Sequence, residues 1–149
     1  MIEINNLTKF YLDEKKLKEI IKKVLIGKFK KIDLSVAFVS SEVIKNLNKK
    51  YRKKNQTTDI LSFAGFKKTE KQFKVKKTGK NVNLGEIIIC PKEVGKNAKR
   101  FKSKFENELY RVLIHGILHL LGYDHEKSKN QAKLMEKKQD YYFQKIINK

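Results

Sequence analysis

The chain has 149 residues, of which 40% are hydrophobic and 35% are charged. This length fits one domain spanning residues 1–149, and the composition excludes a chain that is disordered throughout. Lysine and arginine number 36 against 16 acidic residues, a formal charge of +20 that favours polyanionic partners, nucleic acid first and an anionic membrane surface second. Only three of the basic residues are arginine, so a general bias toward lysine is the alternative explanation.

A single cysteine, Cys90, excludes an internal disulfide and a cysteine-based metal cluster. It is expected to be a small buried residue at the end of a strand. No segment approaches the ~18 consecutive apolar residues of a membrane span, and the N-terminus lacks the apolar core of a secretion signal. We therefore expect a cytoplasmic protein without a membrane span, whose partner is nucleic acid and not a membrane.

The first half of the chain predicts two strand–helix pairs. Residues 1–6 alternate between apolar and polar side chains, as in a half-buried strand. Asp13 is expected to cap a helix from residue 14 to about residue 29, in which apolar residues recur every three or four positions. A strong strand follows over residues 32–39. Ser40 or Ser41 then caps a short helix that ends near residues 51–52.

The second half predicts two more strands and three helices. Residues 51–59 are expected to form a loop, residues 60–64 a strand, and the lysine-rich residues 66–82 an exposed loop or hairpin. A β-branched strand over residues 84–90 ends at Pro91, which opens the next helix. Helices over about 106–121 and to about 147 complete the chain. This order predicts an α+β fold with a small mixed sheet packed with helices.

All three histidines of the chain lie within residues 114–125, IHGILHLLGYDH. In the predicted helix, His115 and His119 are spaced i, i+4, so their rings lie on one face. Gly122 favours a helix stop, after which the turn returns His125 toward the other two. Three imidazoles on one side of a tetrahedral metal leave a fourth position for water, which is typical of a catalytic site. Three core histidines, each bonded to a backbone carbonyl, are the alternative interpretation.

The rest of this helix is apolar around most of its circumference, so we expect it to be buried at the centre of the fold. A narrow polar stripe, expected to line an internal cleft, contains Glu108, Arg111, His115 and His119.

Three segments together resemble the YbeY family of metal-dependent endoribonucleases, and the resemblance covers nearly the whole chain in order. The segments are residues 47–52 (LNKKYR) with 58–63 (TDILSF), residues 84–87 (LGEI) and residues 115–125 (HGILHLLGYDH). The last motif is the most specific. Two positions depart from the family pattern: Glu86 stands where aspartate is usual, and Ala64 stands where proline is frequent.

The resemblance implies a zincin-like fold around a central metal-binding helix. It implies one zinc ion, or another divalent transition metal such as Ni²⁺, held by His115, His119 and His125, with Arg52 and His115 serving catalysis. The activity implied is single-strand-specific RNA cleavage in ribosomal RNA maturation, at the 3′ end of small-subunit RNA, and in ribosome quality control. Ribosomal RNA and the ribosome or its small subunit are the implied partners of a monomeric protein.

The candidate residues suit phosphodiester cleavage. Neutral imidazoles leave a bound metal its full charge, so it can acidify water toward pH ~7 and polarise a phosphoryl oxygen. Arg52 can bind phosphate oxygens with two parallel hydrogen bonds, although a surface salt bridge or phosphate contact is the alternative. Asp124, Glu86 and Glu108 are candidates for proton transfer or for orienting a histidine ring, with orientation favoured for Asp124. The sequence does not identify which residue is the general base. The nucleophile is either metal-bound water or the RNA 2′-hydroxyl.

Two other functions remain alternatives. One is a metallohydrolase of another substrate, such as a peptide. Classical zinc proteases carry a glutamate directly after the first histidine as the general base, whereas this chain has Gly116, which argues against peptide hydrolysis. The other alternative is a basic ribosome-associated RNA-binding protein whose metal is structural.

Overall fold

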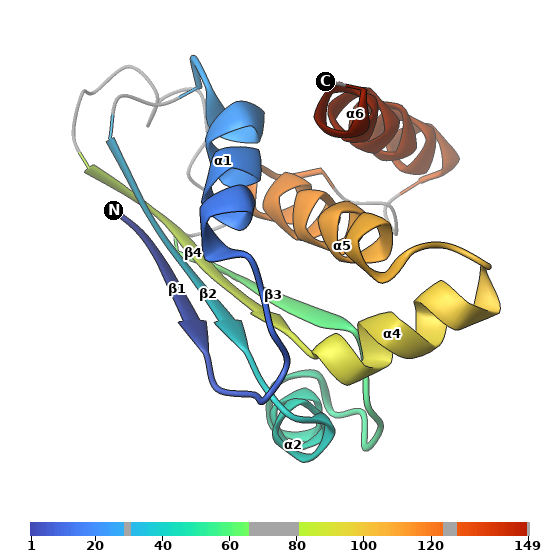
Figure 1. Cartoon of the computed structure of the whole chain (residues 1–149). Coiled ribbons are helices and arrows are strands. Elements are labelled where there is room, and N and C mark those ends of the chain that lie inside the picture. Colours follow the sequence, from blue (N-terminus) through green and yellow to red (C-terminus); the bar gives the residue numbers. More distant parts are fainter. Residues whose placement is uncertain (29–30, 66–80, 124–127, 149) are drawn as a thin grey trace.

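A computed structural model describes residues 1–28, 31–65, 81–123 and 128–148. In these residues the strands form one sheet in the order β1-β2-β4-β3. Strands β1, β2 and β4 run parallel, and β3 is an antiparallel edge strand beside β4 (Figure 1). The predicted α+β fold with a small mixed sheet is therefore confirmed. The strands are β1 (Ile2–Asn6), β2 (Lys31–Phe38), β3 (Ile60–Ala64) and β4 (Asn81–Ile89).

The helices cover both faces of this sheet. Figure 1 shows α1 and α5 on one face, α2 on the other, and α6 packed on the far side of α5 from the sheet. In the described residues the order of helices and strands is the predicted one. The helices are α1 (Glu14–Leu25), α2 (Ser41–Arg52), α4 (Pro91–Arg100), α5 (Phe105–Leu120) and α6 (Lys129–Ile147).

The cap predicted for α1 is present, but the helix ends earlier than expected. The Asp13 carboxylate accepts a hydrogen bond from the backbone N–H of Lys16 at 3.1 Å, which satisfies one of the free donors of the first turn. The helix ends at Leu25 instead of near residue 29. Ile26 leaves the helical conformation and Gly27 has a φ of 73°, which glycine adopts without strain.

Strand β4 begins earlier than the sequence predicts. Residues 81 and 82, expected in a loop, pair with residues 31 and 32 of β2 and so belong to the strand. The rest of the expected loop or hairpin, residues 66–80, lies outside the described residues. No helix of the described part is both long and apolar enough to cross a membrane.

The main core lies between the sheet and the helices α1 and α5. Leu17, Ile20 and Ile21 of α1 and Leu113, Ile114 and Ile117 of α5 are essentially inaccessible to solvent. A smaller core lies on the opposite face, where Ile44 of α2 packs near Leu61 of β3 and Cys90. Cys90 is fully buried just after β4, as expected. Helix α5 contacts α1, α4, α6, β3 and β4, so it occupies the predicted central position.

Candidate metal centre

Helix α5 places two of the three histidines on one face and then ends where the sequence predicts. Gly122 follows the last turn with a φ of 102°, a conformation that favours glycine. Its backbone N–H donates to the carbonyl of His119, and the N–H of Tyr123 donates to the carbonyl of Leu118. These bonds satisfy carbonyl groups that the helix end would otherwise leave without partners.

The rings of His115 and His119 converge through the same ring atom. Their Nε2 atoms are 3.1 Å apart and their ring centroids 4.7 Å apart. Two nitrogen lone pairs at this distance repel unless a proton or a cation lies between them. Zinc–nitrogen bonds of ~2.0–2.1 Å at a tetrahedral angle separate two ligand nitrogens by about 3.3 Å. The histidine pair therefore fits two of the ligand positions around one metal ion.

The opposite side of the His115 ring is held by α6. The Nδ1 atom of His115 lies 2.8 Å from the side-chain oxygen Oε1 of Gln139. Gln139 was not among the residues predicted from sequence, although a signal was present. It lies on the stripe of α6 that also contains the buried Met135, Phe143 and Ile146, where a polar side chain needs a partner.

Gly116, directly after the first histidine, faces the sheet at very short range. A Cβ atom placed there would lie 2.6 Å from Cδ1 of Ile60, and 3.3 Å from both Cδ1 of Ile87 and Oγ of Ser62. The missing side chain thus lets α5 approach β3 and β4 closely beside the histidines. A glutamate at this position would project into the sheet, which agrees with the argument against a protease-type base.

Arg52, the last residue of α2, is anchored to β3. Its Nη2 atom donates to the backbone carbonyl of Ser62 at 2.7 Å, and its guanidinium lies 5.6 Å from the ring centre of Phe63. Residues 59 and 65 make backbone hydrogen bonds to the chain of β4. In an antiparallel pair every second residue makes such bonds, so the odd-numbered residues here face β4 and residue 62 faces away from it. The Ser62 carbonyl therefore points to the free edge of the sheet, and the Ser62 side chain points to Gly116.

The loop after Arg52 is fixed by Asn48. This side chain is 3% exposed and donates from Nδ2 to the carbonyl of Gln56 at 3.0 Å. Lys53 turns the chain with a φ of 57°, and its backbone N–H bonds the carbonyl of Asn48. Arg52 is thus held from both sides, by the end of α2 and by the edge of the sheet.

Glu108 does not reach the histidines. It lies seven residues before His115 on α5, about 10 Å along the helix axis. Its side chain is 12% exposed and lies 3.8 Å from the guanidinium of Arg111. Burial raises the pKa of Glu108; Arg111 opposes this shift and the nearby carboxylate of Asp59 adds to it. The structure therefore separates Glu108 from the histidine pair, and the role expected for it stays a prediction.

Glu86 lies on the opposite face of the sheet. Along β4, Ile87 and Ile89 face the main core under α5, so Glu86 and Ile88 face the other side. Glu86 is exposed and lines a hollow of about 380 Å³ together with Glu3 and Asp33. The structure does not bring this carboxylate to the histidine pair, and the role expected for it stays a prediction.

The remaining candidates cannot be placed. His125 and Asp124 lie outside the described residues, so the third ligand and the expected orienting role of Asp124 stay predictions. Within the described ranges, no group of three or more histidine, cysteine, aspartate or glutamate side chains could hold a metal ion. The two-histidine pair is therefore the part of the predicted centre whose geometry is known.

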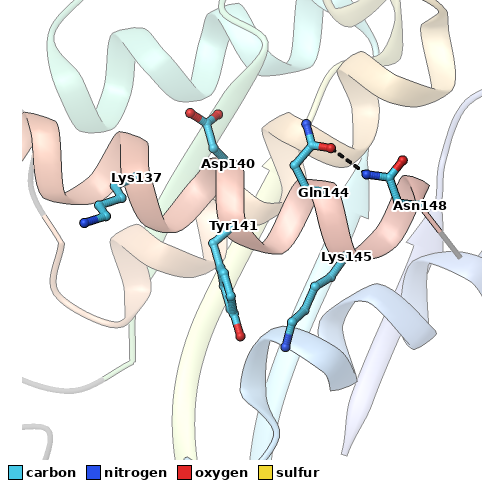
Figure 2. A pocket seen from close by; sticks show the side chains of 6 residues that line it. All are labelled: Lys137, Asp140, Tyr141, Gln144, Lys145 and Asn148. Carbon is cyan, nitrogen blue, oxygen red and sulfur yellow. Dashed lines mark hydrogen bonds between the residues drawn. The ribbon is translucent and has the colours of Figure 1, made fainter.

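A second hollow, of about 590 Å³, lies on α6 (Figure 2). At about 100° per residue, its lining residues fall on the side of α6 opposite Gln139. This hollow therefore faces away from the histidine pair. Its six lining residues are Lys137, Asp140, Tyr141, Gln144, Lys145 and Asn148.

Fold and site together define an α+β protein whose central helix carries a histidine pair suited to a metal, as in metal-dependent hydrolases. The family model described as Endoribonuclease YbeY matches residues 3–147. The chain belongs to the YbeY endoribonuclease family.

Individual relatives agree with this assignment. The chain is 49% identical to Endoribonuclease YbeY of Thermodesulfovibrio yellowstonii over 104 residues, which cover 70% of this chain and 60% of the relative. It is 41% identical to Endoribonuclease YbeY of Thermotoga neapolitana over 133 residues, 89% of this chain and 77% of the relative. The solution structure of TM1509 from Thermotoga maritima superposes with a TM-score of 0.67 at 34% identity, covering 98% of this chain and 89% of the other.

Proposed function

We propose that this protein is a single-strand-specific, metal-dependent endoribonuclease acting in ribosomal RNA maturation and ribosome quality control. The observation that carries the proposal is the 3.1 Å approach of the two Nε2 atoms on the central helix of a YbeY-family fold. RNA as the substrate class follows from the family. The 3′ end of small-subunit ribosomal RNA, and the ribosome or its small subunit as partner, come from the resemblance of the three motifs.

His115 and His119, with His125 as the third ligand, are proposed to hold one zinc ion or a similar divalent cation. Such a cation supplies a Lewis acid that polarises a phosphoryl oxygen and makes water more acidic. This set of three neutral nitrogen ligands suits an ion that must keep its positive charge. We further propose that residues 1–149 form one zincin-like domain that acts as a monomer in the cytoplasm.

The proposed task of Arg52 is to bind the non-bridging oxygens of the scissile phosphate. A guanidinium offers five donors in a planar fork, of which the structure assigns one to the Ser62 carbonyl. That bond orients the fork at the free edge of β3, beside the strand segment that packs against Gly116. Arg52 is exposed, so a phosphate can approach it from solvent.

Cleavage of single-stranded ribosomal RNA by purified protein tests this proposal. We expect cleavage to stop when a chelator removes the metal, to return with zinc, and to be absent in a separately purified His119→Ala variant. Equal cleavage by the variant would indicate a contaminating nuclease and contradict the proposal. Peptide cleavage without RNA cleavage would favour another hydrolase, and zinc removal that unfolds an inactive protein would favour a structural metal.

A further inference from the structure

Gln139 contacts the candidate ligand His115 on the ring atom that faces away from His119. The Oε1 atom of Gln139 lies 2.8 Å from Nδ1 of His115, while Nε2 of His115 faces the neighbouring ring at 3.1 Å. An amide oxygen can only accept a hydrogen bond, so this contact requires a proton on Nδ1. In a neutral imidazole, a proton on Nδ1 leaves the in-plane lone pair on Nε2, the atom through which a metal would bind.

The position of Gln139 is fixed by packing. Met135 and Phe143, one turn before and one turn after it on α6, are both buried in the main core. A second contact between the two helices lies one turn away, where the guanidinium of Arg111 stacks 4.2 Å from the ring centre of Phe143. Two successive turns of α6 are thus packed against α5, and this packing places the amide of Gln139 beside His115.

We propose that Gln139 is a positioning residue that holds His115 in the tautomer and ring orientation required for metal binding. The inference rests on the proposed function, because it assigns a partner to one of the proposed ligands. Groups that bond the outer nitrogen of a ligand histidine orient the ring and raise its basicity, and their loss typically weakens metal affinity by about 10–100-fold.

Zinc affinity, measured by competition with a chromophoric chelator, tests the inference through binding. Gln139→Leu keeps the size of the side chain but removes the acceptor, and we expect zinc to bind about 10–100-fold more weakly. Gln139→Glu keeps an oxygen at this position and should bind zinc at least as tightly as the original protein. Gln144→Leu is the matched control, because Gln144 is exposed on the opposite side of α6 and its loss should leave the affinity unchanged.

The tautomer of His115 provides a second readout that a merely structural role would not move. In the metal-free protein, ¹⁵N chemical shifts of the imidazole should show a protonated Nδ1. This pattern should persist in Gln139→Glu and Gln144→Leu and be lost in Gln139→Leu. Thermal unfolding of the metal-free variants identifies any loss of fold, and a Gln139→Leu variant that unfolds is replaced by Gln139→Met for the same measurements.

Zinc affinity and tautomer that are unchanged in the folded Leu or Met variant would overturn the inference. The proposed function fails in a different way. Protein that binds zinc through a Gln139-dependent His115 but leaves RNA intact would contradict the nuclease proposal and support this inference. If the protein cleaves RNA but its zinc affinity does not depend on Gln139, the nuclease proposal is supported and this inference is contradicted.

Discussion

The orientations of Arg52 and His115 depend on contacts that the sequence motifs do not reveal. For Arg52 the partner is a backbone group within a motif, and for His115 it is a side chain outside the motifs. Arg52 binds the Ser62 carbonyl, and His115 meets Gln139, a residue on another helix. The sequence motifs identify Arg52 and His115, but they do not identify the contacts that position these two side chains. Their roles can be separated by single substitutions.

Replacing Arg52 should slow RNA cleavage without changing the affinity for zinc. We expect Arg52→Ala to lower the rate of RNA cleavage by about 10²–10³-fold, the usual loss when one donor to a transition-state oxyanion is removed. Arg52→Lys should restore only part of the rate, because an ammonium group cannot make two parallel bonds to one phosphate.

The matched control is Arg100→Ala, an exposed arginine at the end of α4. It should cleave RNA at the original rate, and all three variants should bind zinc equally. A fully active Arg52→Ala would show that Arg52 only anchors α2 to the sheet.

Glu108 makes stability depend on pH in a defined direction. Its pKa is raised by burial, so the folded state binds a proton more readily than the unfolded chain does. Its effect on stability is then most favourable at low pH and is lost as pH rises through the raised pKa. Relative to Glu108→Gln, which does not titrate, the wild-type protein should lose stability between acidic and neutral pH.

Urea unfolding of both proteins from acidic to neutral pH measures this difference in the free energy of unfolding. If the wild-type protein instead became more stable relative to Glu108→Gln as pH rises, the contact with Arg111 would outweigh the burial of Glu108.

At the scale of helices and strands, local sequence patterns explain most of the fold. Asp13, Ser40 and Pro91 stand at the starts of the helices they were expected to open, and Gly122 ends α5. The two boundaries that differ depend on other causes. Helix α1 stops where the backbone turns through Gly27, and β4 is extended by pairing with β2 across the sheet.

The site is less accessible to sequence reasoning than the fold. The spacing of His115 and His119 predicts their convergence, because both lie on one helix. Gln139 is 24 residues from His115 along the chain, and its contact depends on how α6 packs on α5. For Glu86, a sequence motif gives no information about which face of the sheet the side chain occupies.

The close packing of α5 on the sheet depends on the absence of a side chain at position 116. Gly116→Glu would place a Cβ atom 2.6 Å from Cδ1 of Ile60 and force its carboxylate into the packed contact between α5 and the sheet. We expect the free energy of unfolding to fall by about 3 kcal/mol or more.

Gly95→Glu, on α4, is the control because the nearest atom is 3.9 Å from its Cβ position. It should change stability by less than about 1 kcal/mol. Equal stability of both variants in chemical denaturation would refute this packing.

At the scale of the whole molecule, the charge of +20 is the dominant property. Such a field attracts the phosphate backbone without reading base sequence, so selectivity for one RNA site must come from elsewhere. The ribosome as a platform would supply it in the proposed function.

RNA affinity should therefore fall steeply with salt. If about six phosphates are neutralised, the log–log slope for single-stranded RNA is about −4, a loss of about 10²–10³-fold between 50 and 200 mM salt. Fluorescence anisotropy with a labelled RNA measures this slope. His119→Ala should show nearly the same slope, because it leaves every lysine and arginine in place. An affinity insensitive to salt would show that the lysines are a compositional bias without a role in RNA binding.

Zinc binding to the metal-free protein by isothermal titration calorimetry tests the central claim most directly. We expect one zinc ion per chain in the original protein, and binding that is lost or strongly weakened in His119→Ala and in His125→Ala. A protein that binds no zinc, or variants that bind it as tightly as the original, would contradict the histidine metal centre.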